Sequence, residues 1–217
     1  MEFLLNAFLS FYSMESLKFL AGFCILAYLI GSIPTGYIIV KLKTGKDIRE
    51  VGSGSTGATN VKRVLGKKWF FIVMLLDAFK GALPVILAKA SLQAGLLLDP
   101  YGIYAVACAI FVIVGHSKPL FLNFKGGKSV ASGVGTILAL SPLAGLIIAL
   151  IWGVITYISK YVSLGSIVAL ILSPFIMYFL DAPIAYVAYC AIAAIYIVYL
   201  HRENIKRLLA GNENKVR

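Results

Sequence analysis

Residues 47–63, DIREVGSGSTGATNVKR, combine closely spaced glycines with small polar and basic side chains. Gly52, Gly54 and Gly57 spell G-x-G-x-x-G, but no strand or βαβ unit accompanies them, which argues against dinucleotide binding. Glycines let backbone N–H groups approach an anion, so the segment favours a phosphate site. A solvated loop whose basic residues only set membrane orientation is the alternative. The side chains that could bind an anion are Ser53, Ser55, Thr56, Thr59, Asn60, Lys62 and Arg63.

Residues 115–136, GHSKPLFLNFKGGKSVASGVGT, form a second such segment. Gly126–Ser129 open a short helix, and free N–H groups at a helix N-terminus bind phosphate. A Walker A loop would need glycine at position 122, where Leu122 stands, so ATP binding is not predicted. We expect a phosphate contact from this backbone and from Lys128. The alternative is a glycine hinge with a lysine that sets topology.

The third polar group combines residues 161–166, YVSLGS, with the tail HRENIKRLLAG that begins at His201. Ser163 and Ser166 open one apolar helix, whereas His201 and Asn204 close the last one. Both groups are therefore expected at the same membrane face. The alternative for the tail is an amphipathic helix whose basic residues lie on anionic lipid.

Other catalytic patterns are missing from the sequence. It contains no Cys/His ligand spacing and no G-x-S-x-G elbow. Neither His116 nor His201 is followed five residues later by an acid, so the histidine–aspartate box of many acyltransferases is absent. Asp77 and Lys80 lie three residues apart inside an apolar helix, where we interpret them as a mutually neutralising structural pair.

Composition places these segments in a membrane protein. Of 217 residues, 60% are hydrophobic and only 13% are charged, with a mean hydropathy of +0.92. A soluble domain keeps roughly 45–50% apolar residues, because its surface must be wet. The net charge is +11, and the basic residues lie between the apolar runs. This placement indicates the positive-inside rule rather than nucleic-acid binding.

The apolar runs predict an all-α integral membrane bundle of seven transmembrane helices in one domain, 1–217. Basic residues concentrate in segments 43–68 and 115–128 and in the tail 201–217, so these are expected in the cytoplasm and the N-terminus outside. Residues 3–12, rich in Phe and Leu, are expected in the membrane interface. The seven predicted spans are 17–41, 68–90, 101–117, 128–140, 142–159, 163–180 and 183–200.

Taken together, these segments resemble the bacterial membrane glycerol-3-phosphate acyltransferases that use acyl phosphate, the PlsY family. Each stretch alone is weakly specific, but all six occur in the family's order over nearly the whole chain. At Ser55 the family usually has Asn after Gly-Ser-Gly, so we assign position 55 no catalytic role. The matching stretches are GSIPTGY (31–37), GSGSTGATNVKR (52–63), DAFKG (77–81), GHSKPLFLNFKGGKSVA (115–131), YVSLGS (161–166) and HRENIKRL (201–208).

The resemblance implies transfer of an acyl chain from acyl phosphate to glycerol 3-phosphate, giving lysophosphatidate and phosphate in phospholipid biosynthesis. Catalysis is then expected to use Ser53, Lys128, His201 and Asn204. Substrate binding is expected to use Arg63, Asn60, Gly126, Gly127, Ser129 and Ser166. The base could be either the substrate phosphate or His201.

The expected partners are acyl phosphate, glycerol 3-phosphate and the lipid bilayer, with no nucleic acid, metal ion or organic cofactor. The chain is expected to be a monomer in the bacterial cytoplasmic (inner) membrane, with its active site facing the cytoplasm. A transporter of an anionic metabolite is the rival hypothesis, because it would also need a basic vestibule. It predicts polar residues on both sides of the membrane midplane, whereas here they crowd one side.

Overall fold

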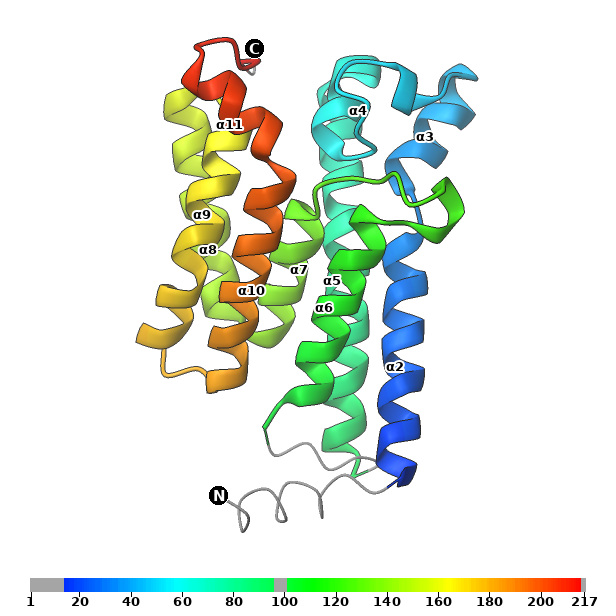
Figure 1. The fold of residues 1–217 in the computed structure, drawn as a ribbon, viewed down its shortest axis with the longest axis vertical. Helices are drawn as coiled ribbons and strands as arrows, with labels where there is room; N and C mark the ends of the chain where they lie inside the picture. The colour runs from blue at the N-terminus through cyan, green and yellow to red at the C-terminus, as the bar shows by residue number, and fades with distance from the viewer. Residues whose placement is uncertain (1–13, 96–100, 216–217) are drawn as a thin grey trace.

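The chain forms a bundle of helices that run along one common axis (Figure 1). The computed structural model describes residues 14–95 and 101–215, and no strand occurs within them. The expected interfacial segment 3–12 lies outside the described residues. The α-helices are α2 (Met14–Ser32), α3 (Thr35–Thr44), α4 (Ala58–Leu65), α5 (Lys67–Gln93), α6 (Ile103–Ser117), α7 (Val130–Leu140), α8 (Pro142–Ser159), α9 (Val162–Phe179), α10 (Ile184–Leu200) and α11 (Arg202–Leu209). Two short 3₁₀ turns are η1 (Ile48–Glu50) and η2 (Leu120–Leu122).

A break at Pro34 divides the first apolar run into α2 and α3. Proline has no N–H to donate, and it disfavours the helical conformation of the residue before it, here Ile33. Gly45, with φ of 70°, then ends α3, and its N–H donates to the Lys41 carbonyl oxygen. The polar segment that follows reaches α4 at the end of the bundle where α11 also lies (Figure 1).

Close backbone packing holds α7 against α5. A Cβ on Gly81 would lie 2.2 Å from the Ser132 carbonyl oxygen, and one on Gly135 would lie 2.0 Å from that of Ala78. A larger side chain at either glycine would therefore force the two helices apart. This contact sets the start of α7 beside the middle of α5.

The outer surface of the bundle is apolar. Large hydrophobic side chains point outward from several helices, among them Leu150 at 66% exposure, Ile195 at 74% and Phe179 at 78%. Such a surface is unfavourable in water and suits the hydrocarbon core of a bilayer. The prediction of an integral membrane protein is thereby supported.

Each of the seven expected spans contains a helix, but they are not equally long. Five spans have the length and hydropathy to cross a membrane, and α10 with α11 would make a sixth if this pair, bent by 62°, counts as one span. Helix α7 has 11 residues and at 1.5 Å per residue covers only about 16 Å, whereas the hydrocarbon core is about 30 Å thick. Among the described residues the structure thus supports five or six spans, and the number seven and the orientation stay predictions.

Candidate active site

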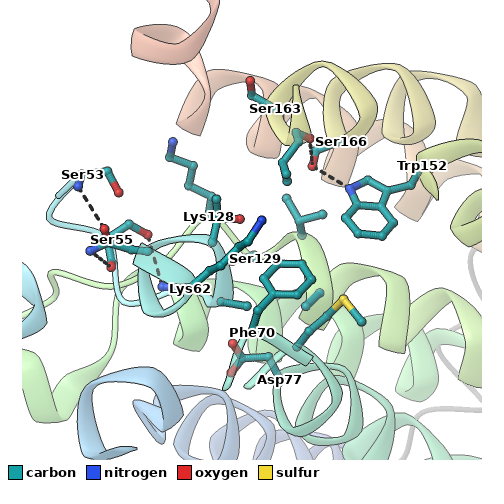
Figure 2. A pocket seen from close by; sticks show the side chains of 18 of the residues that line it. Ser53, Ser55, Lys62, Phe70, Asp77, Lys128, Ser129, Trp152, Ser163 and Ser166 are labelled. Carbon is teal, nitrogen blue, oxygen red and sulfur yellow. Dashed lines mark hydrogen bonds between the residues drawn. The ribbon is translucent and has the colours of Figure 1, made fainter. Parts of the chain in front are cut away.

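One cavity of about 600 Å³ collects the three polar segments singled out in the sequence. Figure 2 shows their side chains around a common space, with Ser53 and Lys62 on one side and Ser163 and Ser166 on the other. Its polar end carries the cations Lys62, Arg63, Lys128, Arg207 and Lys215. An apolar arm continues from it along Phe70, Met74, Leu75, Ala78, Val134, Leu138, Ala149 and Trp152. The arrangement suits an amphiphile with an anionic head.

Asn60 organises the glycine segment before α4. Its Nδ2 donates to the carbonyl oxygens of Ile48 (3.2 Å), Val51 (2.9 Å) and Ser55 (2.9 Å), and its Oδ1 accepts from the Ser53 N–H (3.1 Å). The side chain is only 1% exposed. Asn60 was expected to bind substrate, but its donors and acceptor are engaged within the loop. Its position indicates that it shapes the loop that presents Ser53.

The glycines before α7 do not present free N–H groups. The N–H of Gly126 donates to the Ser117 carbonyl oxygen (3.2 Å), and that of Gly127 donates to the His116 carbonyl oxygen (3.1 Å). Ser129 has φ of 59°, and its Oγ donates to the Ile113 carbonyl oxygen (2.6 Å). These two N–H groups are thus engaged with carbonyl oxygens at the end of α6, and the expected role of Gly126 and Gly127 in holding a phosphate stays a prediction.

Three helix N-termini nevertheless converge on the cavity. Its wall includes Thr59 in the first turn of α4, Ala131 in the first turn of α7 and Ser163 in the first turn of α9. The first N–H groups of a helix have no intrahelical acceptor and carry a partial positive charge. Together with the five cations, they make this end of the cavity favourable for phosphate.

Lys128 lies in a network with the last helix and the tail. Its Nζ donates to Asn204 Oδ1 in a short hydrogen bond, and Asn204 Nδ2 donates to Glu213 Oε1 (2.7 Å). Burial, followed by the positive charge of Arg207, lowers the pKa of Lys128 to about 8. Glu213 opposes this shift, as an opposite charge does. An ammonium that is partly desolvated and charged near neutral pH is well suited to a phosphate.

His201 lies at the junction of α10 and α11, only 4% exposed. Its Nδ1 is 2.8 Å from the Ile197 carbonyl oxygen, which can only accept, so Nδ1 carries a proton. In the neutral ring, Nε2 is then the acceptor. His201 lines the cavity, as expected of a residue that contacts substrate.

Ser166 lies in the wall of the cavity with its hydroxyl engaged. Its Oγ donates to the Val162 carbonyl oxygen (2.8 Å) and accepts from Trp152 Nε1 (3.3 Å) (Figure 2). This contact joins α8 to α9 beside the apolar arm. The expected role of Ser166 in binding substrate stays a prediction.

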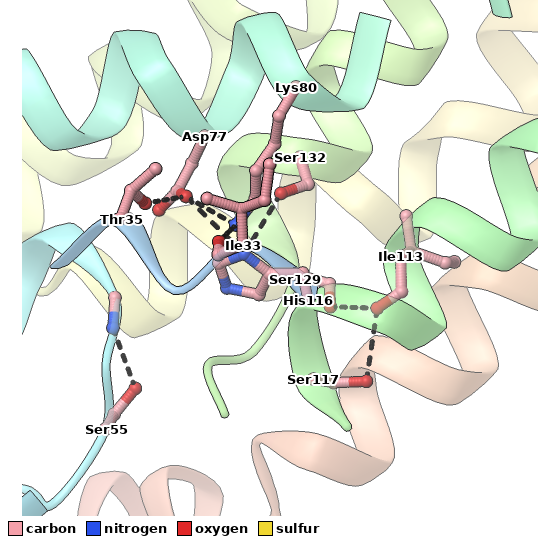
Figure 3. Close-up of polar contacts among 11 residues, drawn as sticks. Ile33, Thr35, Ser55, Asp77, Lys80, Ile113, His116, Ser117, Ser129 and Ser132 are labelled. Atoms are coloured by element: carbon pink, nitrogen blue, oxygen red, sulfur yellow. Dashed lines mark hydrogen bonds and ion pairs between the residues drawn. The ribbon is translucent and has the colours of Figure 1, made fainter. Parts of the chain in front are cut away.

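Figure 3 shows a buried polar cluster, two members of which line the cavity. Lys80 Nζ is 2.9 Å from Asp77 Oδ1 and also donates to the Ile33 carbonyl oxygen (2.7 Å), so the proposed structural pair is present. His116 Nδ1 lies 3.6 Å from the same carboxylate oxygen and 3.2 Å from Ser132 Oγ. Asp77 and His116 line the cavity.

Two groups at the cavity were missed by sequence reasoning. His116 was considered only as a possible member of a catalytic box, and Glu213 was not considered at all. No local pattern pairs His116 with Asp77, because the two residues are 39 positions apart (116 − 77). Within residues 14–95 and 101–215, no three His, Cys, Asp or Glu side chains lie together as a metal site would require.

The chain matches a family model described as glycerol-3-phosphate acyltransferase over residues 21–211. It is 44% identical over 190 residues to a glycerol-3-phosphate acyltransferase of Desulforamulus reducens, covering 88% of this chain and 92% of that protein. It is 43% identical over 202 residues to one of a Nostoc species, covering 88% and 89%.

Two solved structures share the fold. Both are crystal structures of PlsY, an integral membrane glycerol 3-phosphate acyltransferase. The glycerol 3-phosphate form superposes with a TM-score of 0.83 at 39% identity, covering 91% of this chain and 96% of that one. The lysophosphatidic acid form superposes with a TM-score of 0.80 at 37% identity, covering 91% and 95%.

Proposed function

This chain belongs to the glycerol-3-phosphate acyltransferase family, and we propose that its acyl donor is acyl phosphate. The products would be lysophosphatidate and inorganic phosphate. The observation that carries the proposal is the single cavity in which a cationic end adjoins an apolar arm. Acyl phosphate has this shape: a compact anionic head on one hydrocarbon chain. Glycerol 3-phosphate adds a second small phosphate that the same cationic end would accommodate.

The two phosphates can be assigned to different parts of the polar end. Lys128, the first turn of α7 and Ser53 would hold the head of the donor. Arg63 and the residues near His201 and Asn204 would hold glycerol 3-phosphate. Cations and helix N-termini act here as preorganised electrostatic groups, which cost no reorganisation as charge develops.

The reaction needs alignment more than a strong protein base. A hydroxyl oxygen of glycerol 3-phosphate attacks the acyl carbonyl carbon, and the bond from that carbon to the phosphate oxygen breaks. The hydroxyl proton goes to the departing phosphate, whose second pKa is about 6 by analogy with a phosphate monoester. Lys128 and Ser53 would stabilise the oxyanion during the attack.

His201 is the alternative base. Its neutral ring would present Nε2 as acceptor, because Nδ1 is committed to the Ile197 carbonyl oxygen. The same Nε2 could instead accept a hydrogen bond from the substrate and align it. The pH–rate profile of His201→Asn distinguishes the two roles. If His201 is the base, the variant should lose the limb of the profile that reports titration of the base. If His201 only positions the substrate, the variant should keep that limb.

The cavity is expected to face the cytoplasm of a bacterial inner membrane. The basic loop before α4 and the tail helix α11 lie at the same end of the bundle (Figure 1), as the positive-inside rule requires for one cytoplasmic face. The protein is proposed to act as a monomer.

The deciding experiment offers the purified, detergent-solubilised protein radiolabelled glycerol 3-phosphate with either palmitoyl phosphate or palmitoyl-CoA at equal concentration. We expect lysophosphatidate and phosphate in equal amounts from acyl phosphate and no product from the thioester. The phosphate of the acyl donor carries oxygens beside the attacking hydroxyl that can accept its proton, whereas a thioester offers no such group there, so we expect the thioester to need a protein base. Comparable product from palmitoyl-CoA would refute the donor assignment.

A further inference from the structure

After α11 the chain turns back and brings residues 212–215 to the cavity. Gly211 has φ of 69°, and the N–H of the residue after it donates to the Arg207 carbonyl oxygen (2.8 Å). Lys215 Nζ then lies 5.7 Å from the centre of the Tyr161 ring, at the start of α9. The tail therefore links the ends of α11 and α9 instead of extending away from the bundle.

This turn places the Glu213 carboxylate against three groups of the site. It accepts from Ser163 Oγ (3.0 Å), Asn204 Nδ2 (2.7 Å) and Arg207 Nε (2.7 Å), and its side chain is 5% exposed. Burial alone would raise the pKa of Glu213, but these bonds outweigh it and hold the pKa below its ordinary value. The family model ends at residue 211, so this carboxylate lies outside the matched stretch.

The contacts of Glu213 determine which way the Asn204 amide points. A carboxylate can only accept, so it must face the amide nitrogen, and the amide oxygen is left facing Lys128. With the two ends exchanged, an NH₂ group would face the ammonium and neither could accept. We infer that Glu213 is a positioning residue for acyl transfer: it orients Asn204 and through it directs the Lys128 ammonium into the cavity. This inference rests on the proposed role of Lys128.

The charges around Lys128 give this arrangement an observable consequence. The titratable and charged groups that face it from the neighbouring elements are Arg63, His201, Arg202, Arg207 and Glu213. Glu213 is the carboxylate among them, and it raises the pKa of Lys128 against burial and the cations. Its removal should lower that pKa further, so that Lys128 loses its proton at a lower pH.

The test compares Glu213→Gln in the full chain with Glu203→Gln. Glu203 belongs to the same tail, is 58% exposed and pairs at 3.2 Å with Lys206, which is 72% exposed, so its variant is a matched control for lost charge. Initial rates are measured with palmitoyl phosphate across pH and at several glycerol 3-phosphate concentrations. For Glu213→Gln we expect kcat to fall several-fold at pH 8 and its alkaline limb to move to lower pH by about one unit, the typical effect of one nearby opposite charge. Glu203→Gln should match the wild type.

A second comparison tests whether the effect passes through Lys128. In a Lys128→Arg background the alkaline limb should vanish, since guanidinium does not titrate in this range, and Glu213→Gln should then shift nothing. If the wild type makes no product, or if the alkaline limb of the pH profile persists in Lys128→Arg, the proposed role of Lys128 is refuted, independently of Glu213. If the wild type behaves as expected and Glu213→Gln keeps its limb, only the role of Glu213 fails.

Two further results would overturn the positioning role. A lower KM for glycerol 3-phosphate with unchanged kcat would mean that the carboxylate competes with substrate phosphate. Loss of folded protein in both Glu213→Gln and Glu213→Ala, judged by size exclusion and thermal melting in detergent, would mean that the contact serves only the fold.

Discussion

Replacing Lys128 by alanine should abolish most activity and leave the fold intact. The ammonium contacts Asn204 and lies in the wall of the cavity, where the proposed donor phosphate would accept from it. A hydrogen bond to a charged group contributes about 1.5–3 kcal/mol, and a preorganised donor to a developing oxyanion about 2.7–4 kcal/mol. Because each 1.36 kcal/mol is a factor of ten, kcat should fall about 100- to 1000-fold.

The stability of the same variant should change little. The neighbours of Lys128 include Arg63, Arg202 and Arg207, all of which lower its pKa, so removing its charge relieves repulsion. We therefore expect a melting temperature in detergent equal to or slightly above that of the wild type. A loss of activity with retained melting temperature separates a functional role from a structural one.

Lys125→Ala is the matched control. Lys125 belongs to the same basic segment, is exposed, and does not line the cavity. The two lysines contribute equally to the positive-inside signal, so a topology effect would appear in both variants. Full activity in Lys128→Ala, or equal losses in the two variants, would refute the reasoning.

Four other outcomes are expected. The kcat of the wild type should fall as pH rises through about 8, where Lys128 loses its proton, and a profile flat to pH 9.5 would contradict this assignment. Arg63→Ala should raise the KM for glycerol 3-phosphate about 10-fold, the equivalent of 1.4 kcal/mol, while Lys67→Ala should not; an unchanged KM argues against the role of Arg63. A cysteine placed at position 67 should resist membrane-impermeant reagents added to intact cells, and labelling from outside would show that the orientation is reversed. Activity should survive strong chelators, and a loss reversed by Mg²⁺ would demonstrate a metal requirement that the sequence does not predict.

The family resemblance predicted from short motifs is confirmed, and so is membrane embedding. The roles of individual residues were less accessible. Asn60 and Ser129 line the cavity, and their polar side-chain atoms bond to nearby backbone groups, so their expected roles in binding substrate stay predictions. A sequence motif marks a position where a particular residue type is required. It does not show whether that side chain contacts the substrate or bonds to the surrounding protein.

The amino-acid sequence is enough to predict an apolar helical bundle, the membrane around it and the short segments that hold most of the glycine and basic residues. These properties are local, since the length of an apolar run and the position of a proline act within one stretch of chain. Which polar groups remain available to a ligand depends on how distant segments pack together. Carbonyl oxygens at the end of α6 accept hydrogen bonds from the N–H groups of Gly126 and Gly127. The turn at Gly211 brings Glu213 into contact with Asn204. Hydrogen-bond partners and pKa values depend on contacts between segments that are far apart in the sequence. These contacts form only when the helices pack together.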